Sequence, residues 1–451
     1  MIQLFNAANI FSKLASNSSL LPMGIKDGSH SIGMTTASYI TGKEVEGKDR
    51  FIDEAGTELI WIGGIPLYKK IIDLTVYKLA KQDFNVDVRL FEDKSKTILK
   101  KAIEHAANTD IKNALEKASK HKGLFQGLAL GKFIASTALT LVSYWALTNF
   151  RHKHTEKNII KQIQEEEAIK KTAAQFGQKV QLNTAPKQNN LSFGMNLDIN
   201  ALKNFMFNPV NNMMILDGGI TAERLGESRN PQDFMGYVIK EGAFWGFMYF
   251  AGDIIQNHFI KKAAKKNHPI DLDIKVLQCE EFKANVKNGE LEKALKEFST
   301  DKPDEEIYEA LFKPCEPNKI VDKGTISDNL IVKMAKKSGI IKTVKGKEDI
   351  IDTRFHIDVD SVKKIKQNIA NFLEKAPGAS ENNGEALEKF LKKAVSLKKG
   401  AILKNIGITS FSLGVIVPGI MLAMRYIDKD NKEFQVKKDI HAKLQKEGSF
   451  A

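Results

Sequence analysis

Two stretches of this chain carry no charged residue over a length that can cross a membrane. They are Phe133–Phe150 and Asn405–Met424. A helix of about 20 apolar residues spans the hydrocarbon core of a bilayer. Each stretch ends at a basic residue, Arg151 or Arg425, whose long side chain can reach the polar surface. A buried helix of a large soluble core is the alternative, but length and basic ends favour two transmembrane helices.

The composition of the whole chain is that of a globular protein. Of its 451 residues, 42% are hydrophobic and 27% are charged, so any contact with lipid is local. The net charge is +13, yet only seven of the 68 basic residues are arginines. Base and phosphate recognition depends on the planar fork of Arg, and no aromatic–basic patch accompanies the lysines. The sequence therefore predicts no nucleic-acid partner.

The two uncharged stretches are called the clean spans below. Two shorter apolar segments, residues 54–68 and 241–255, are less regular than these spans. The first starts at Glu54 and is interrupted by Gly-Gly-Ile-Pro, and the second carries Asp253. Each segment fits a core helix, a re-entrant segment or a membrane span with a functional irregularity.

The order of features around these segments repeats along the chain. Ile40-Thr41 lies upstream of Glu54, Ile220-Thr221 lies upstream of Glu241, and each glutamate opens an apolar segment. Val86–Leu90 and Leu272–Val276 come next, and both show the two-residue period of a half-buried strand. In both copies Ala-Leu-Glu-Lys and then Lys-Gly precede a clean span that ends at arginine. We therefore expect an internal duplication.

The predicted fold is mainly α with a few short strands, built from duplicated helix–strand–helix–transmembrane-helix units and associated with a membrane. A polar Lys/Glu-rich insertion interrupts the second unit at about residues 278–356. The predicted segments are an N-terminal amphipathic segment (1–32), repeat unit 1 (33–154), a charged helix and flexible linker (155–212), repeat unit 2 (213–426) and a charged C-terminal tail (427–451).

No motif predicts an enzyme, a cofactor or a metal site. Gly42–Asp49 has the spacing of a phosphate-binding loop, but Asp49 stands where magnesium binding requires Ser or Thr. His152 and His154 lie two residues apart, without a third ligand in the pattern. Cys279 and Cys315 have neither zinc-site spacing nor a recognisable base nearby. We expect a non-enzymatic protein that needs no cofactor.

The two irregular segments are the candidate site. Duplicated membrane proteins often bind their ligand where short, broken hydrophobic segments occupy matching positions of the two halves. The candidate carboxylates are Glu54, Glu241 and Asp253, and Lys132 and Lys404 at the entries of the clean spans are their expected partners. The alternative is that both segments are amphipathic interfacial helices whose carboxylates lie in water.

The leading functional hypothesis is a structural or scaffolding protein of a bacterial cytoplasmic membrane. It would contact membrane lipid, and its polar insertion would contact protein partners. The stripe Gly123, Gly127, Gly131 and Ala135 would allow close helix contact in a homo-oligomer. A small transporter or channel with its site between residues 54–68 and 241–255 is the first alternative, and a soluble helical interaction protein is the second.

Overall fold

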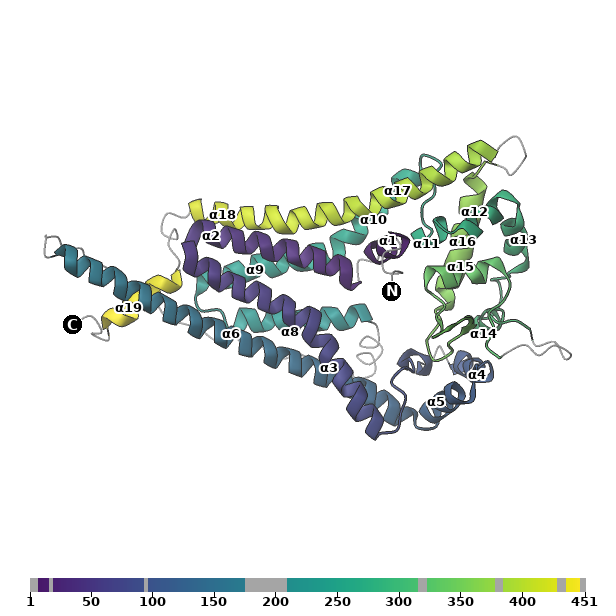
Figure 1. Cartoon of the computed structure of the whole chain (residues 1–451), viewed down its shortest axis with the longest axis horizontal. Helices are drawn as coiled ribbons and strands as arrows, with labels where there is room; N and C mark the ends of the chain where they lie inside the picture. Colours follow the sequence, from purple (N-terminus) through teal and green to yellow (C-terminus); the bar gives the residue numbers. More distant parts are fainter. Residues whose placement is uncertain are drawn as a thin grey trace. The chain divides into compact units, whose positions relative to one another are not determined.

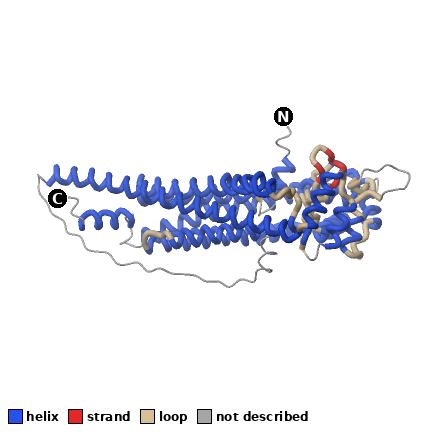
Figure 2. Tube along the Cα trace, turned by 90° about the horizontal axis from the view of Figure 1, so that it is seen from below, coloured by secondary structure: helices blue, strands red, loops and turns tan. Residues whose placement is uncertain are grey.

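The computed structural model is mainly helical, as the sequence predicts, with a single pair of short strands in its described part (Figure 2). It describes residues 7–15, 19–92, 96–174, 209–314, 323–377, 384–427 and 435–446. Most of the predicted linker after the charged helix, Cys315 and the start of the C-terminal tail lie outside these residues.

The chain forms two compact units that are interleaved in sequence. Unit 1 combines residues 1–16, 70–133 and 253–405, and unit 2 combines residues 17–69, 134–252 and 406–451. The predicted segments 33–154 and 213–426 therefore each contribute to both units.

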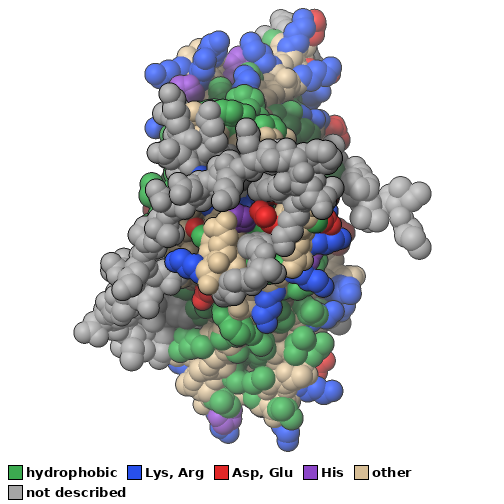
Figure 3. Space-filling model, turned by 90° about the vertical axis from the view of Figure 1, so that its left-hand side faces the viewer, with side chains coloured by type: hydrophobic (Ala, Val, Ile, Leu, Met, Phe, Trp, Pro, Cys, Tyr) green, Lys and Arg blue, Asp and Glu red, His purple; other side chains and the backbone are tan. Residues whose placement is uncertain are grey.

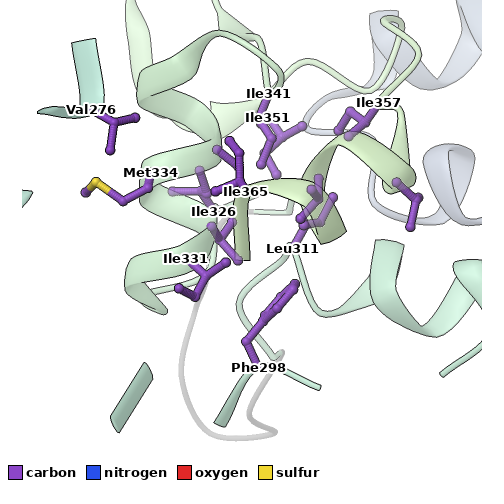
Figure 4. Packing of buried hydrophobic residues seen from close by; sticks show 14 of the residues in the cluster. Val276, Phe298, Leu311, Ile326, Ile331, Met334, Ile341, Ile351, Ile357 and Ile365 are labelled. Atoms are coloured by element: carbon purple, nitrogen blue, oxygen red, sulfur yellow. The ribbon is translucent and has the colours of Figure 1, made fainter. Parts of the chain in front are cut away.

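Unit 1 is a small-helix domain with an ordinary apolar core. Residues from its helices and from the turns between them converge there, including Phe298, Leu311 and Ile331 (Figure 4). Its elements are α1 (Ala7–Ala15), η2 (Asp73–Tyr77), η3 (Val88–Phe91), α4 (Lys96–Glu104), α5 (Thr109–Lys120), α10 (Gly252–Ala264), α11 (Ile274–Leu277), α12 (Glu280–Lys287), α13 (Glu290–Glu297), α14 (Asp304–Glu309), α15 (Leu330–Ser338), β1 (Thr343–Val344), β2 (Lys347–Ile351) and α16 (Val359–Lys375).

The polar insertion is part of this core. Residues 278–356 form α12 to α15 and the antiparallel pair β1–β2, and they bury Phe282, Leu291 and Ile351. The hydrophobic residues recur at helical spacing between the lysines, so each short helix has one apolar face. The insertion is therefore a folded layer of unit 1.

The prediction of strands at Val86–Leu90 and Leu272–Val276 is wrong. Within Val86–Leu90 the chain forms the 3-10 turn η3, and within Leu272–Val276 it begins the short helix α11. Asp87 accepts a hydrogen bond from the backbone N–H of Arg89, and Asp273 accepts one from that of Lys275. Each aspartate thus caps a helical turn, which outweighs the alternating hydrophobic pattern.

Unit 2 is a bundle of longer helices with irregular turns. Its helices are α2 (Leu20–Leu59), η1 (Ile60–Gly64), α8 (Pro209–Gly226), α9 (Pro231–Trp245), η5 (Gly246–Ala251), η7 (Ser412–Ile416), α18 (Val417–Ile427) and α19 (Gln435–Lys446). It also holds parts of α3 (Ile65–Ile72), α6 (Lys122–Ala174) and α17 (Gly384–Phe411), which continue into the residue ranges of unit 1.

Helix α2 turns back on itself to make a helical hairpin (Figure 1). A Cβ built on Gly24 would lie 3.8 Å from Cδ1 of Ile62, and one on Gly28 would lie 3.5 Å from Oε1 of Glu58. Both pairs are centred on residue 43, in the glycine-containing stretch that resembles a phosphate-binding loop. That stretch is helical, so it does not connect a strand to a helix as phosphate binding requires.

The first half of this hairpin touches the C-terminal apolar helix at two glycines. A Cβ on Gly33 would lie 2.1 Å from the carbonyl oxygen of Gly414. Only glycine allows the two backbones to approach so closely, as small residues do in membrane helix pairs. Gly123, Gly127 and Gly131 have no such neighbour in the described part of the chain.

The two clean spans lie on helices long and apolar enough to cross a membrane. These helices cover residues 122–168 and 384–426, and the most apolar 18-residue windows are only 22% and 33% buried. Most residues of both windows are therefore not buried inside the protein. Part of the predicted charged tail is the helix α19, which packs Val436 and Ile440 against Ile159 and Ile163 of α6.

Candidate functional site

Unit 2 holds most of the buried polar side chains of the described residues. They number 21 of 26, although unit 2 is less than half of the chain. At their centre lies a set that we call the ion network. Its carboxylates are Glu46, Asp49, Asp53, Glu54, Asp233 and Glu241, and its cations are Arg50, Arg151, Arg224, Arg229, Lys240 and Arg425.

Arg151 connects the end of the first clean span to the α2 hairpin. Its guanidinium lies 3.1 Å from the carboxylate of Asp53 and 3.9 Å from that of Asp49. It also donates a 2.6 Å hydrogen bond to the hydroxyl of Tyr237 on α9. Only 2% of Arg151 is exposed, so one guanidinium holds three helices together through fully buried polar contacts.

Glu54 and Glu241 face cations from the hairpin of α8 and α9. Nζ of Lys240 lies 2.7 Å from Glu54, and Arg224 pairs with Glu241. Arg224 also donates to the hydroxyl of Thr57. Thus α2, α8 and α9 share one charge-compensated interior.

Arg229 anchors the turn between α8 and α9. It lies 2.9 Å from Asp49 and 2.8 Å from Asp233 at the start of α9. Burial alone would raise the pKa of Asp233, but the arginines around it, Arg229 first, lower that pKa to about 2. Asp233 therefore stays ionised, and the pair with Arg229 persists at any physiological pH.

Glu46 and Arg425 close the network at the end of the second clean span. Arg425 donates to the carboxylate of Glu46 and to the hydroxyl of Thr41. Glu46 is 8% exposed, and its Oε2 accepts no hydrogen bond from the described residues. Burial raises the pKa of Glu46 more than Arg425 lowers it. This carboxylate is the least compensated member at the edge of the network.

A cavity of about 360 Å³ opens beside this edge. Glu46, Asp49, Arg50, Asp233 and Arg425 make its charged side. Its apolar side comes from α2, α9 and α18 and includes Met34, Ala37, Met235, Ile239, Met421 and Leu422. Its size lies within the range of roughly 300–1,000 Å³ that is usual for small-molecule sites.

Matching irregularities follow the two glutamates. The π-helical turn η1 begins six residues after Glu54, and the π-helical turn η5 begins five residues after Glu241. Both turns lie in the two segments predicted as the candidate site. Extra residues in a helical turn widen it, and such turns are frequent at functional sites.

The structure brings two of the five predicted site residues together. Glu54 and Glu241 both lie within 4.0 Å of Nζ of Lys240. Asp253 is exposed and belongs to unit 1. Lys132 and Lys404 are not the partners of these glutamates, because Lys132 pairs with Asp73 and Lys404 lies over the ring of Phe259. Glu54 and Glu241 are buried, so the alternative that places them in water is wrong.

Sequence reasoning missed the cations of the network, although a signal was present. Five of the seven arginines belong to it, in a chain that otherwise uses lysine. Arg stays charged when buried and makes several directed hydrogen bonds, whereas Lys readily loses its charge. Rare arginines in a lysine-rich chain therefore mark the buried ion pairs.

The ion network is made of paired charges. The described residues contain no group of three or more His, Cys, Asp or Glu that could hold a metal ion. Each carboxylate of the network lies beside at least one guanidinium or ammonium group. Comparison with known protein families, curated proteins and solved structures found no match.

Proposed function

We propose that the protein is an integral membrane protein of structural or interaction type, with unit 2 embedded in the bilayer. The observation that carries this proposal is the inverted polarity of unit 2. It buries charges, as described above, and it exposes hydrophobic side chains. Of the 33 large hydrophobic side chains exposed in the described residues, 25 belong to unit 2.

Many of these exposed apolar residues lie along the helices that carry the clean spans. Val142 is 60% exposed and Phe411 is 57% exposed. Others on the same helices are Leu139, Trp145, Phe150, Val415, Ile416, Ile420 and Met424. One face of the molecule accordingly shows broad hydrophobic areas (Figure 3). Lipid would cover such a surface, whereas water would favour association of molecules through it.

A structural role for the ion network follows from its charge balance. Its six carboxylates are matched by six cations, and the contacts join α2, α6, α9 and α18. Ionised groups away from water are stable only when paired, so the pairs fix which helices meet and in which register. In lipid, apolar contacts discriminate little between helix partners. The ion network would therefore determine which helices pack together in the bundle.

We further propose that the two halves arose by duplication. The α2 hairpin and the α8–α9 hairpin each place a buried glutamate before a π-helical turn. Asp87 and Asp273 then cap a short helical turn in the same way. Corresponding features thus recur in the same order, which supports repeats whose boundaries are near residues 33–154 and 213–426.

Transport is the second candidate, and the polar interior of unit 2 favours it. Beyond the network, this interior contains Asp27, His30 and Asp217. Ionisable side chains inside a membrane bundle line ion or proton paths in many transporters. The paired π-helical turns occupy the positions where duplicated transporters hold their site.

Unit 1 would face water and contact proteins through its lysine-rich surface. We keep the cytoplasmic membrane of a bacterium as the proposed location, since outer-membrane proteins span as β-barrels and the apolar segments here are helical. Lysines near the bilayer would add attraction to anionic lipid.

Two measurements test this proposal. We expect the full-length protein to remain in the membrane pellet after alkaline carbonate washing, and release into the supernatant would contradict membrane integration. Flux of protons or small ions into proteoliposomes then separates the two candidates. Flux that Glu54→Gln and Glu241→Gln abolish, while Asp253→Asn does not, would establish transport and replace the structural role.

A further inference from the structure

The cavity beside Glu46 combines two surfaces that suit the two ends of one amphiphile. Its charged side holds Arg50 and Arg425, and its apolar side holds several methionines. Met side chains adapt their shape to an alkyl chain because they are unbranched and polarisable. A purely polar solute would leave the apolar side wet, and a hydrocarbon would leave the charged side unpaired.

The two arginines have donors to spare. In the described residues, the hydrogen bond of Arg50 and both those of Arg425 use Nη1 alone. A guanidinium has five N–H groups in a planar fork that matches phosphate oxygens. The cavity therefore offers an anion-binding side even though both arginines also contact carboxylates.

On the same charged side of the cavity, Glu46 favours a cation, whereas the two arginines favour an anion. It lines the cavity, its side chain is 11% exposed, and its Oε2 accepts no hydrogen bond from the described residues. Asp49 and Asp233 also line the cavity, but Arg229 already binds both. Glu46 is therefore the lining carboxylate with unused capacity for an N–H donor, and a buried acceptor without a donor is unfavourable.

We propose that this cavity binds the head group of a phospholipid that carries a primary ammonium group. The phosphate lies at Arg50 and Arg425, the ammonium group donates to Glu46, and the start of an acyl chain follows Met235 and Met421. Arg425 immediately follows the second clean span, so in a membrane the cavity lies at head-group level. This placement rests on the proposed membrane location.

Lipid binding to the purified full-length protein in detergent tests the inference without requiring membrane insertion. Short-chain phosphatidylethanolamine, phosphatidylcholine and phosphatidylglycerol are titrated, and bound lipid is measured by native mass spectrometry. Phosphatidylethanolamine should bind at least about tenfold more tightly than the other two, because only its head group has both a phosphate and N–H donors. Equal binding of phosphatidylglycerol would overturn the role of Glu46, and equal binding of all three would overturn the site.

Matched variants locate the binding. Glu46→Gln should lose at least about tenfold in affinity for phosphatidylethanolamine. Glu44→Gln, which makes the same charge change on an exposed side chain two residues away, should bind normally.

Gly236→Leu should also block binding, because Gly236 lines the cavity. Gly242→Leu on the same helix projects into open space and is its control. Normal lipid binding by both Glu46→Gln and Gly236→Leu would place the lipid elsewhere. Carbonate release together with normal lipid selectivity would instead leave the site intact and overturn the membrane location alone.

Discussion

Replacing Arg151 by methionine tests whether the ion network stabilises the bundle. Methionine keeps the length and much of the apolar contact of the side chain but removes its charge and all its hydrogen bonds. Asp53 would lose a 3.1 Å ion pair, and Tyr237 would lose a 2.6 Å donor. Breaking a buried pair by removing one partner costs about 3–5 kcal/mol.

The expected loss for Arg151→Met lies at the lower end of that range. Asp53 keeps Arg50 at 3.3 Å, and Asp49 keeps Arg229 at 2.9 Å and a hydrogen bond from Thr155. We therefore expect a loss of about 3 kcal/mol in the free energy of unfolding. The assay is reversible unfolding in mixed micelles, followed by the fluorescence of the chain's tryptophans.

Lys161→Met is the matched control, because Lys161 lies on the same helix and its side chain is 76% exposed. Its stability should equal that of the original protein, since exposed ion pairs contribute little. If Arg151→Met were as stable as Lys161→Met, the ion network would not stabilise the bundle. Arg151→Lys should fall between the two, because lysine restores the charge without the planar fork.

Two further predictions concern stability and packing. The pKa of Asp233 is about 2 in the folded protein against 3.8 for an ordinary aspartate, so its pair with Arg229 stabilises the protein above about pH 4. That contribution should disappear as the pH falls from 4 towards 2. In a titration of the free energy of unfolding against pH, Asp233→Asn should remove this part of the curve. A curve that Asp233→Asn leaves unchanged would refute the pairing. Gly33→Ala should lower the unfolding temperature by several degrees, because its Cβ would meet the carbonyl oxygen of Gly414, whereas Gly242→Ala should not.

The helices and the apolar spans could be predicted because their signals are local. An uncharged run of span length determines an apolar helix wherever it lies in the fold. The same locality explains the two strand errors. Val86–Leu90 and Leu272–Val276 alternate as strands do, but Asp87 and Asp273 cap helical turns at those positions. A capping side chain acts over two or three residues and can override a short alternating pattern.

The partners of the candidate glutamates could not be read from the sequence. Glu54 meets Lys240, nearly 190 residues away, because α2 folds into a hairpin and lies beside α9. Nothing local specifies that hairpin except glycines near the turn. The sequence did indicate that Glu54 and Glu241 belong together, since both open irregular apolar segments. It could not show that Lys132 and Lys404 are used elsewhere.

The division of the chain into two interleaved units could not be predicted from the sequence either. Residues 278–356 are polar on average, yet their short helices bury Phe282 and Leu291 in unit 1. Average composition does not reveal the one apolar face of a short helix, whereas residue spacing does.

We expect unit 2 to have its hydrophobic surface in lipid and its charges inside. The direct test is the labelling of single cysteines by a membrane-impermeant maleimide in proteoliposomes, in a background with Cys279 and Cys315 replaced by serine. Val142→Cys and Phe411→Cys should resist labelling until detergent is added, although both positions are more than half exposed. Lys161→Cys, on the charged part of α6, should react when that side of the membrane is accessible. Rapid labelling of Val142→Cys and Phe411→Cys in intact proteoliposomes would show that this surface of unit 2 does not lie in lipid.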